Sequence, residues 1–198
     1  TDEGYAVTDF PAFSGYAVEY GLDAPFTVEY HDDIGSTNDR ARTLAQSGAD
    51  DVVVLADRQT AGRGRLARSW SSPSGGAWMS IICRPAIPPS DVPILTFAAT
   101  VAVTEALRDE GIQAGIKWPN DVIVPSSSDS KIAGVLAELD GEVDRVAWVV
   151  IGVGVNANVT LRELPPGATS ALAERGPLDR REFVQRVLET FDHLRDDP

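Results

Sequence analysis

Residues 113–153, QAGIKWPNDVIVPSSSDSKIAGVLAELDGEVDRVAWVVIGV, decide the fold class of this chain. The stretch holds four apolar runs rich in β-branched residues, which predict strands at 113–117, 122–124, 131–140 and 145–153. Turn-forming residues at 125–130 and 140–144 separate the last three runs, and connections this short join antiparallel neighbours. The stretch therefore predicts successive hairpins in a mixed, largely antiparallel sheet.

The flanking segments add further strands and helices to this sheet. Strands are expected at 27–31, 51–56 and 78–84, and helices at 36–46, 91–110 and 179–194. Because strands and helices do not alternate regularly, the expected class is α+β, with the helices packed on the sheet. We interpret residues 1–26 as an N-terminal linker or the remnant of a preceding domain, and residues 27–198 as one domain.

The composition limits the classes of function. The 198 residues are 43% hydrophobic, which suffices for one well-packed domain. A net charge of −13, spread along the chain, disfavours non-specific binding of nucleic acid. No run of eighteen apolar residues and no export leader is recognised, so we expect a cytoplasmic protein without membrane association. The single cysteine, Cys83, lies in an apolar run and is expected to be a buried core thiol.

Residues 57–77 form a long segment of Gly, Ser, Arg and Pro without periodicity, and loops of this length usually carry function. Its centre is the motif GRGRLAR at 62–68. Glycines let backbone amides approach an anion closely, and arginines offer donors that match carboxylate and phosphate oxygens. The motif therefore predicts an anion-binding loop, with a segment that contacts RNA or a solvated loop as the alternatives. It is not a Walker loop, because no lysine followed by Ser or Thr comes after the second glycine.

Lysine is rare in this chain: of 17 basic residues, only Lys117 and Lys131 are lysines. Lys117 opens the motif KWPND at 117–121, and Lys131 opens KIAGVL at 131–136. An ammonium is a compact charge that meets a single phosphate oxygen in a tight site, which a planar guanidinium does not imitate. The bias therefore predicts a functional role for both lysines. The alternatives are a plain turn with Trp118 in the core and an exposed lysine at a hairpin end.

The segment GVGVN at 152–156 stands at a predicted strand end. Its two glycines would admit a flat ring or a phosphate against the backbone, and Asn156 offers an oxygen to a hard cation. A glycine-rich strand exit with an Asx turn explains the same residues. The segment alone leaves both interpretations open.

Together, GRGRLAR, KWPND, KIAGVL and GVGVN resemble the motifs of biotin protein ligases in order and spacing, and Ser36-Thr37-Asn38 and Gln59-Thr60-Ala61 match the same family. The resemblance covers roughly residues 27–194. It implies a fold like that of biotin ligases and class II aminoacyl-tRNA synthetases, with residues 27–198 as the catalytic domain. It also implies that the protein activates biotin with ATP to biotinyl-5'-AMP and transfers biotin to a lysine of a biotin carboxyl carrier protein.

The resemblance also assigns residues to the site. Lys131 would stabilise the charge that grows in the transition state and, with Arg63, is a predicted catalytic residue. The predicted biotin-binding residues are Ser36, Thr37, Gln59, Gly62, Arg63, Arg65 and Gly134. The predicted ATP- and adenylate-binding residues are Arg63, Gly64, Arg65, Arg68, Trp70, Lys117, Asn120, Lys131, Gly152, Gly154 and Asn156. Trp70 and Trp118 would wall the pocket, and Asp121 and Asn156 would hold Mg²⁺.

Three other functions compete with this one. A lipoate-type ligase shares the implied architecture, but its signature lacks the Gly-Arg-Gly-Arg loop. A nucleic-acid-binding module would use Arg63, Arg65 and Arg68 to bind phosphates. The net negative charge of the chain and the lack of aromatic residues between these arginines argue against it. A non-catalytic biotin sensor would keep the pocket and lose catalysis, whereas this chain retains both lysines. The resemblance would also place a C-terminal β-barrel domain after the last helix, and we expect the 198 residues not to include it. A homodimer is left open.

Overall fold

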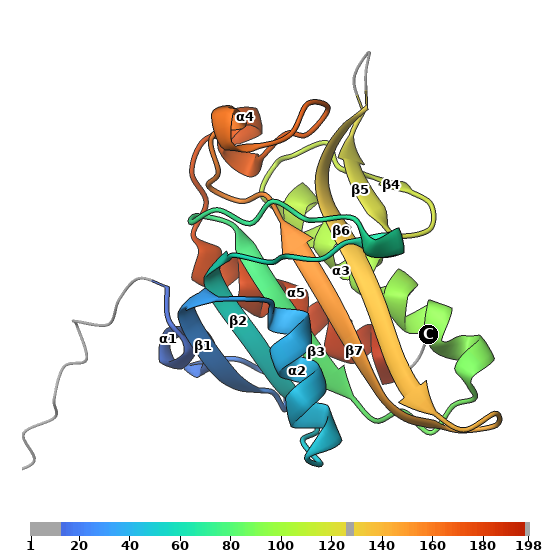
Figure 1. Ribbon diagram of the computed structural model, residues 1–198. Coiled ribbons are helices and arrows are strands. Elements are labelled where there is room, and N and C mark those ends of the chain that lie inside the picture. The colour runs from blue at the N-terminus through green and yellow to red at the C-terminus, as the bar shows by residue number, and fades with distance from the viewer. Residues whose placement is uncertain (1–12, 126–128, 197–198) are drawn as a thin grey trace, which may run out of the picture.

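One seven-stranded sheet forms the centre of the computed structural model, which describes residues 13–125 and 129–196 (Figure 1). The strand order is β1-β2-β3-β7-β6-β5-β4. The strands are β1 (Thr27–Ile34), β2 (Val52–Gln59), β3 (Ala77–Cys83), β4 (Gly115–Lys117), β5 (Asp121–Val124), β6 (Ser130–Gly141) and β7 (Val146–Val155). Only the pairing of β1 with β2 is parallel among these strands, so the predicted mixed, largely antiparallel sheet is confirmed.

Helices cover both faces of the sheet in Figure 1. The helices are α1 (Gly15–Glu19), α2 (Thr37–Gln46), α3 (Val92–Asp109), α4 (Ala171–Arg175) and α5 (Arg180–Asp196). The long helices α3 and α5 pack on one face and form the main core with alternate residues of the strands. On the other face, α2 forms a smaller core with Val54, Ile82 and Val150. The expected α+β class is confirmed.

The predicted elements are all found, with ends displaced by a few residues. Strand β2 continues to Gln59, three residues beyond its predicted end. Gln59 therefore lies at the end of the strand, where the following loop begins. Ser36 is the N-cap of α2, and its hydroxyl accepts from the Asp39 amide at 3.4 Å. The predicted turn at 125–130 includes residues 126–128, which lie outside the described residues.

Residues 13–26 pack on the same core as the rest of the described chain. Phe13, Val18 and Phe26 belong to the main core, and α1 contacts β1 and α5. The sequence pattern of this segment predicts no element, because a helix of five residues shows no apolar period.

Helix α3 is long and apolar, although it contains no uninterrupted run of eighteen apolar residues. With the turn before it, residues Pro89–Asp109 form a helix long and apolar enough, by length and composition, to cross a membrane. In the structure, 56% of the most apolar part of this helix is buried inside the domain, where α3 packs on β6, β7 and α5. A helix that is apolar almost all round is therefore explained by burial in the core.

Cys83 confirms its expected place in the core. The residue is 3% exposed at the end of β3, and burial raises the pKa of its thiol to about 12. At neutral pH the thiol is protonated, as is typical of a structural cysteine.

A half-buried ion pair ties the start of α5 to β2. Arg180 Nη1 donates to Asp57 Oδ1 at 2.5 Å and to the Gly76 carbonyl at 3.1 Å. Burial acts to raise the pKa of Asp57, but hydrogen bonds from Arg180, Ser74 and the Gly75 amide outweigh it and lower that pKa below 3.8. The pair therefore stabilises the fold when Asp57 is ionised.

Replacing Asp57 with asparagine is expected to lower the free energy of unfolding at pH 7 by about 1–2 kcal/mol. Because the folded-state pKa is depressed, this stability is present above the ordinary value of 3.8 and disappears as pH falls through the folded-state pKa. Urea unfolding from pH 7 to pH 3 should show the two proteins converging. The exposed pair Asp33–Arg58 supplies the control, since Asp33→Asn should change little at any pH. A constant difference across the range would contradict this account.

Candidate functional site

A cavity of about 460 Å³ opens where β6 and β7 pair beneath the loop that follows β2. This volume suits a small organic ligand. The antiparallel register sets Gly134 opposite Gly154, so that two motifs distant in the sequence form one floor of the cavity. Lys131 and Asn156 stand at the same end of these strands and also line the cavity. The tertiary pairing thus brings KIAGVL and GVGVN together.

The GRGRLAR motif forms the roof of this cavity as a narrow ribbon. Trp70 N donates to Gly62 O at 2.9 Å, and Gly64 N donates to Arg68 O at 2.7 Å. The tip is a short 3₁₀ turn, Arg65–Ala67, in which Leu66 takes a φ of 56° and is 86% exposed. We call residues 62–70 the Arg/Gly ribbon. The amide of Gly64, expected to face an anion, is bound inside the ribbon instead.

Gly62 has a different role from the one expected. It lies outside the cavity wall, and a Cβ at this position would stand 2.5 Å from the Trp70 carbonyl oxygen. Only glycine therefore allows the two arms of the ribbon to pair this closely.

The three arginines of the ribbon have different partners. Arg65 Nη1 donates to Asn120 Oδ1 at 2.7 Å, and the buried Asn120 amide in turn donates to the Val135 carbonyl at 2.8 Å. Arg63 forms ion pairs with Glu138 and, at 3.3 Å, with Asp39. Arg68 is exposed and lines the cavity. Arg65 is thus held beside the cavity by a neutral amide, whereas the charge of Arg63 is balanced by two carboxylates.

Lys131 reaches into the cavity, and Lys117 does not. The Lys131 ammonium lies 2.7 Å from Asp121 Oδ1 and 4.9 Å from the centre of the Trp70 ring. Lys117 ends β4, is exposed and is absent from the cavity wall. The structure therefore brings one of the two lysines to the Arg/Gly ribbon.

The two tryptophans expected to wall the pocket also differ. Trp70 lines the cavity, with its ring against Gly134 and Gly154. A Cβ on Gly154 would stand 2.6 Å from Trp70 Nε1, so the glycines do admit a flat ring, which here is the indole. Trp118 lies neither in the core nor at the pocket, because its side chain is 80% exposed in the turn between β4 and β5.

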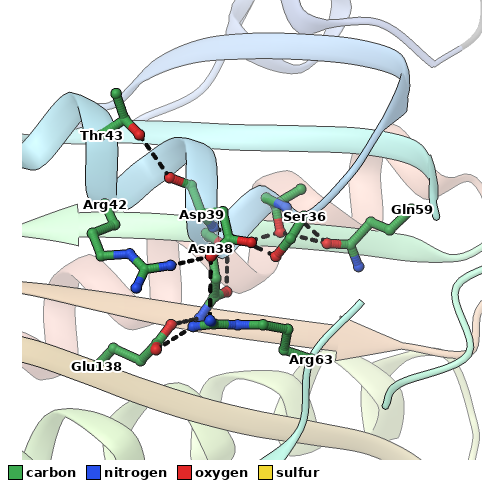
Figure 2. A network of polar contacts seen from close by, with 10 residues as sticks. Ser36, Asn38, Asp39, Arg42, Thr43, Gln59, Arg63 and Glu138 are labelled. Atoms are coloured by element: carbon green, nitrogen blue, oxygen red, sulfur yellow. Dashed lines mark hydrogen bonds and ion pairs between the residues drawn. The ribbon is translucent and has the colours of Figure 1, made fainter. Parts of the chain in front are cut away.

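A buried polar network lies at the end of the cavity beside α2 (Figure 2). Gln59 Oε1 accepts from the amide and the hydroxyl of Thr37, at 2.8 and 3.0 Å. Ser80 Oγ lies 2.8 Å from Thr37 Oγ1 and donates to Asn38 Oδ1 at 2.6 Å. Ser36, Thr37 and Gln59 all line the cavity, so this end presents hydroxyl and amide groups to a ligand.

Two buried atoms in the cavity wall have no hydrogen-bond partner among the described residues: Trp70 Nε1 and Asn156 Oδ1. A buried polar atom without a partner costs free energy, and such atoms mark places where a ligand completes the bonding. Asn156 Nδ2 donates to the Thr169 carbonyl at 2.9 Å, and this bond leaves Asn156 Oδ1 available to a ligand.

The two residues expected to hold Mg²⁺ both line the cavity. Asp121 offers a carboxylate that is paired with Lys131, and Asn156 offers its unpartnered amide oxygen. Across residues 13–125 and 129–196 no group of three or more His, Cys, Asp or Glu side chains forms a metal cage. This sparse oxygen set fits a magnesium ion that substrate phosphates also bind, which is how proteins usually hold that ion.

Several site residues carry no sequence signal of their own. Glu138 joins the polar network through Asn38, but it is one of two acids in a largely apolar strand and stands in no motif. The cavity is closed on one side by Leu164, Pro165 and Ala168, which follow β7 in the loop before α4. This loop is held there because the Lys131 amide donates to the Gly167 carbonyl at 2.9 Å. Such contacts between distant segments are visible only in the structure.

Comparison with known proteins identifies the family of the chain. The family model "Biotin/lipoate A/B protein ligase family" matches residues 32–156. The bifunctional ligase/repressor BirA of Bacillus subtilis is 42% identical over 96% of this chain and 61% of its own length. The biotin–[acetyl-CoA-carboxylase] ligase of Mycobacterium tuberculosis is 36% identical over 80% of this chain and 60% of its own length. The chain thus spans about three fifths of these relatives.

A solved structure carries the same fold. Biotin protein ligase from Aquifex aeolicus, in complex with biotin and ATP, superposes with a TM-score of 0.69 at 30% identity. The match covers 84% of this chain and 69% of that one. Fold, motifs and family model agree, and the chain belongs to the biotin/lipoate A/B protein ligase family.

Proposed function

We propose that this chain is the catalytic domain of a biotin protein ligase, which joins biotin to AMP and then to a lysine of a biotin carboxyl carrier protein. The observation that carries the proposal is the convergence of Lys131 and the Arg/Gly ribbon on one cavity. The names of the relatives, biotin ligases in both cases, support biotin over lipoate as the acid. We place the protein in the cytoplasm, with ATP and Mg²⁺ as further ligands.

The polar end of the cavity suits the ureido ring of biotin. A urea presents one carbonyl acceptor and two N–H donors in one plane, so its site needs donors and acceptors at close quarters. Ser36 and Thr37 supply hydroxyl groups, and Gln59 supplies an amide whose orientation Thr37 and Ser72 fix. The apolar side chains of Met79 and Val153 line the same cavity and suit the thiophane ring and valeryl chain.

The opposite end of the cavity would perform the chemistry. The biotin carboxylate attacks the α-phosphorus of ATP, and the bond to pyrophosphate breaks as the acyl phosphate bond forms. Lys131 and Arg65 are placed to stabilise the negative charge on these oxygens, a contribution that is usually the largest in such a step. Mg²⁺ held by Asp121, Asn156 and the phosphates would supply further positive charge. Trp70 would pack on the nucleotide.

The second step transfers biotin to the carrier. The unprotonated amine of a carrier lysine attacks the acyl carbon of biotinyl-5'-AMP, an amide bond forms, and AMP leaves with the electron pair of the broken C–O bond. The exposed side chains of Arg65 and Leu66 at the ribbon tip would lie where the carrier approaches. The carrier lysine loses its proton to solvent as the amide forms.

Calorimetry with biotin, and then with ATP and Mg²⁺, tests this proposal. We expect biotin to bind and the affinity for biotin to rise in the presence of a non-hydrolysable ATP analogue, because both ligands meet beneath one ribbon. With ATP itself, biotin-dependent exchange of pyrophosphate should be measurable. Binding of lipoate with exclusion of biotin would replace the proposed substrate, and binding of biotin without exchange would favour the sensor.

A further inference from the structure

Glu138 is a carboxylate that the proposed chemistry does not use. It lies on β6, is absent from the cavity wall, and its side chain is 27% exposed. In Figure 2 its two oxygens face the guanidinium of Arg63 and the amide of Asn38, whose Nδ2 donates to Glu138 Oε2 at 2.9 Å. The side chain therefore joins the Arg/Gly ribbon to the buried polar network under the cavity.

The electrostatic environment keeps this carboxylate charged. Burial acts to raise the pKa of Glu138, but the hydrogen bonds from Asn38 and Arg63 and the positive charge of Arg63 outweigh burial and lower it. At neutral pH Glu138 is thus ionised and holds Arg63 by a charge-assisted hydrogen bond.

Arg63 lines the cavity, but its charge is already engaged by carboxylates. Glu138 and Asp39 both neutralise its guanidinium, and neither carboxylate lines the cavity. Arg65, in contrast, is bound by the neutral amide of Asn120, so its positive charge is retained beside the cavity. Of these two arginines, Arg65 is therefore the better placed to bind an anion in the cavity.

The ribbon is attached to the polar network at both ends. Arg63, in the first arm, binds Glu138 and through it Asn38. Beyond the second arm, Ser72 Oγ accepts from Gln59 Nε2 at 2.9 Å. Asn38 and Gln59 are connected through Ser80 and Thr37. The same network thus holds both ends of the ribbon above the cavity.

We propose that Glu138 is the positioning residue of the ribbon: it binds the Arg63 guanidinium so that the ribbon is fixed over the cavity and Arg65 meets the biotin carboxylate. This inference rests on the proposed function and reassigns Arg63 from catalysis to anchoring. It predicts that Glu138 matters for the acid end of the ligand and not for the ureido end.

Two ligands separate these ends: biotin, and biotin methyl ester, which keeps the ureido ring and lacks the anion. Calorimetry on the full chain should show that Glu138→Gln weakens biotin binding about tenfold, as expected for loss of one charge-assisted contact in a partly exposed pair. Binding of the methyl ester should change by less than about twofold. A merely structural fault would weaken both ligands equally, and that result would overturn the proposal.

Arg63→Met breaks the same pair from the ribbon side. If Arg63 only anchors, this variant and the double variant Arg63→Met/Glu138→Gln should match Glu138→Gln, because removing either partner already removes the contact. Once biotin saturates the site, all three should exchange pyrophosphate at one common rate, lowered only as far as displacement of Arg65 lowers it. A lower saturated rate for Arg63→Met alone would place Arg63 on the reacting atoms and contradict its anchoring role.

Asp140→Asn is the matched control, since Asp140 is an exposed acid two residues along the same strand. Asp140→Asn should leave the binding of both ligands unchanged. If it weakened biotin binding as much as Glu138→Gln does, the change in net charge would explain the effect, and the proposal would be overturned. If the unaltered chain binds neither ligand, the proposed function fails, and this inference fails with it. Binding of biotin by the unaltered chain without loss in Glu138→Gln would remove the positioning role alone.

Discussion

Lys131→Ala should lower biotin-dependent ATP–pyrophosphate exchange by about 100- to 1,000-fold, the usual cost of removing one group that stabilises transition-state charge. The ammonium stands at the cavity with its charge 2.7 Å from Asp121 and faces the Trp70 ring. The fold should persist, because the Lys131 side chain is 33% exposed and its strand is held by backbone pairing on both sides. Circular dichroism and radiolabelled pyrophosphate exchange would measure the two properties.

The other lysine of the chain is the control for this prediction. Lys117 is exposed and lies outside the cavity wall, so Lys117→Ala should change exchange by about twofold at most. Lys131→Arg retains the charge but replaces a compact ammonium with a planar group beside Gly134, and it should recover little activity. Unchanged exchange in Lys131→Ala would remove this residue from the mechanism.

Gly152→Ala should be the most damaging change to the cavity floor. A methyl group here would overlap Asn38 Oδ1, and Asn38 is buried and held by Ser80 and Glu138. Displacing Asn38 combines overpacking with loss of buried hydrogen bonds, and should cost about 3 kcal/mol of unfolding free energy. The expected fall in Tm is about 10 °C. Biotin binding should fall as well, because Thr37 moves with the same network.

Gly115→Ala is the control for the glycine prediction, because a Cβ on Gly115 would make only ordinary contact, 3.6 Å from Pro125. Thermal unfolding of both variants, followed by biotin calorimetry below the transition, separates stability from binding. Equal stability of the two variants would show that the network yields to accommodate the methyl group, and would contradict a rigid floor.

The sequence predicted the elements well because their signals are local. Strands β6 and β7 are apolar runs with β-branched residues, bounded by turn formers, and helix α3 is followed by Gly111, which has a φ of 82°. Helix α1 was missed, since five residues carry no period. The segment of α3 was correctly predicted to be a helix, but its burial follows only from the packing of β6, β7 and α5 against it.

The candidate site was predictable in its parts and not in its geometry. The rarity of lysine correctly indicated Lys131 as a cavity residue, but it indicated Lys117 equally. Composition cannot distinguish the two, because it does not say where a side chain points. The motif GRGRLAR indicated an anion-binding loop, but not that its arms pair with each other and use the Gly64 amide internally. Glu138 had no signal, because its role comes from Arg63, 75 residues away.

By itself, then, the sequence determined the α+β class, the order of the strands along the chain and the family, since apolar period and motif spacing are properties of neighbours in the chain. Only the tertiary structure decided that β6 pairs with β7 so that Gly134 faces Gly154, and that Arg63 binds carboxylates while Arg65 stands at the cavity. The physical reason is that the groups around a charged side chain decide what that side chain binds. These groups come from segments far apart in the chain.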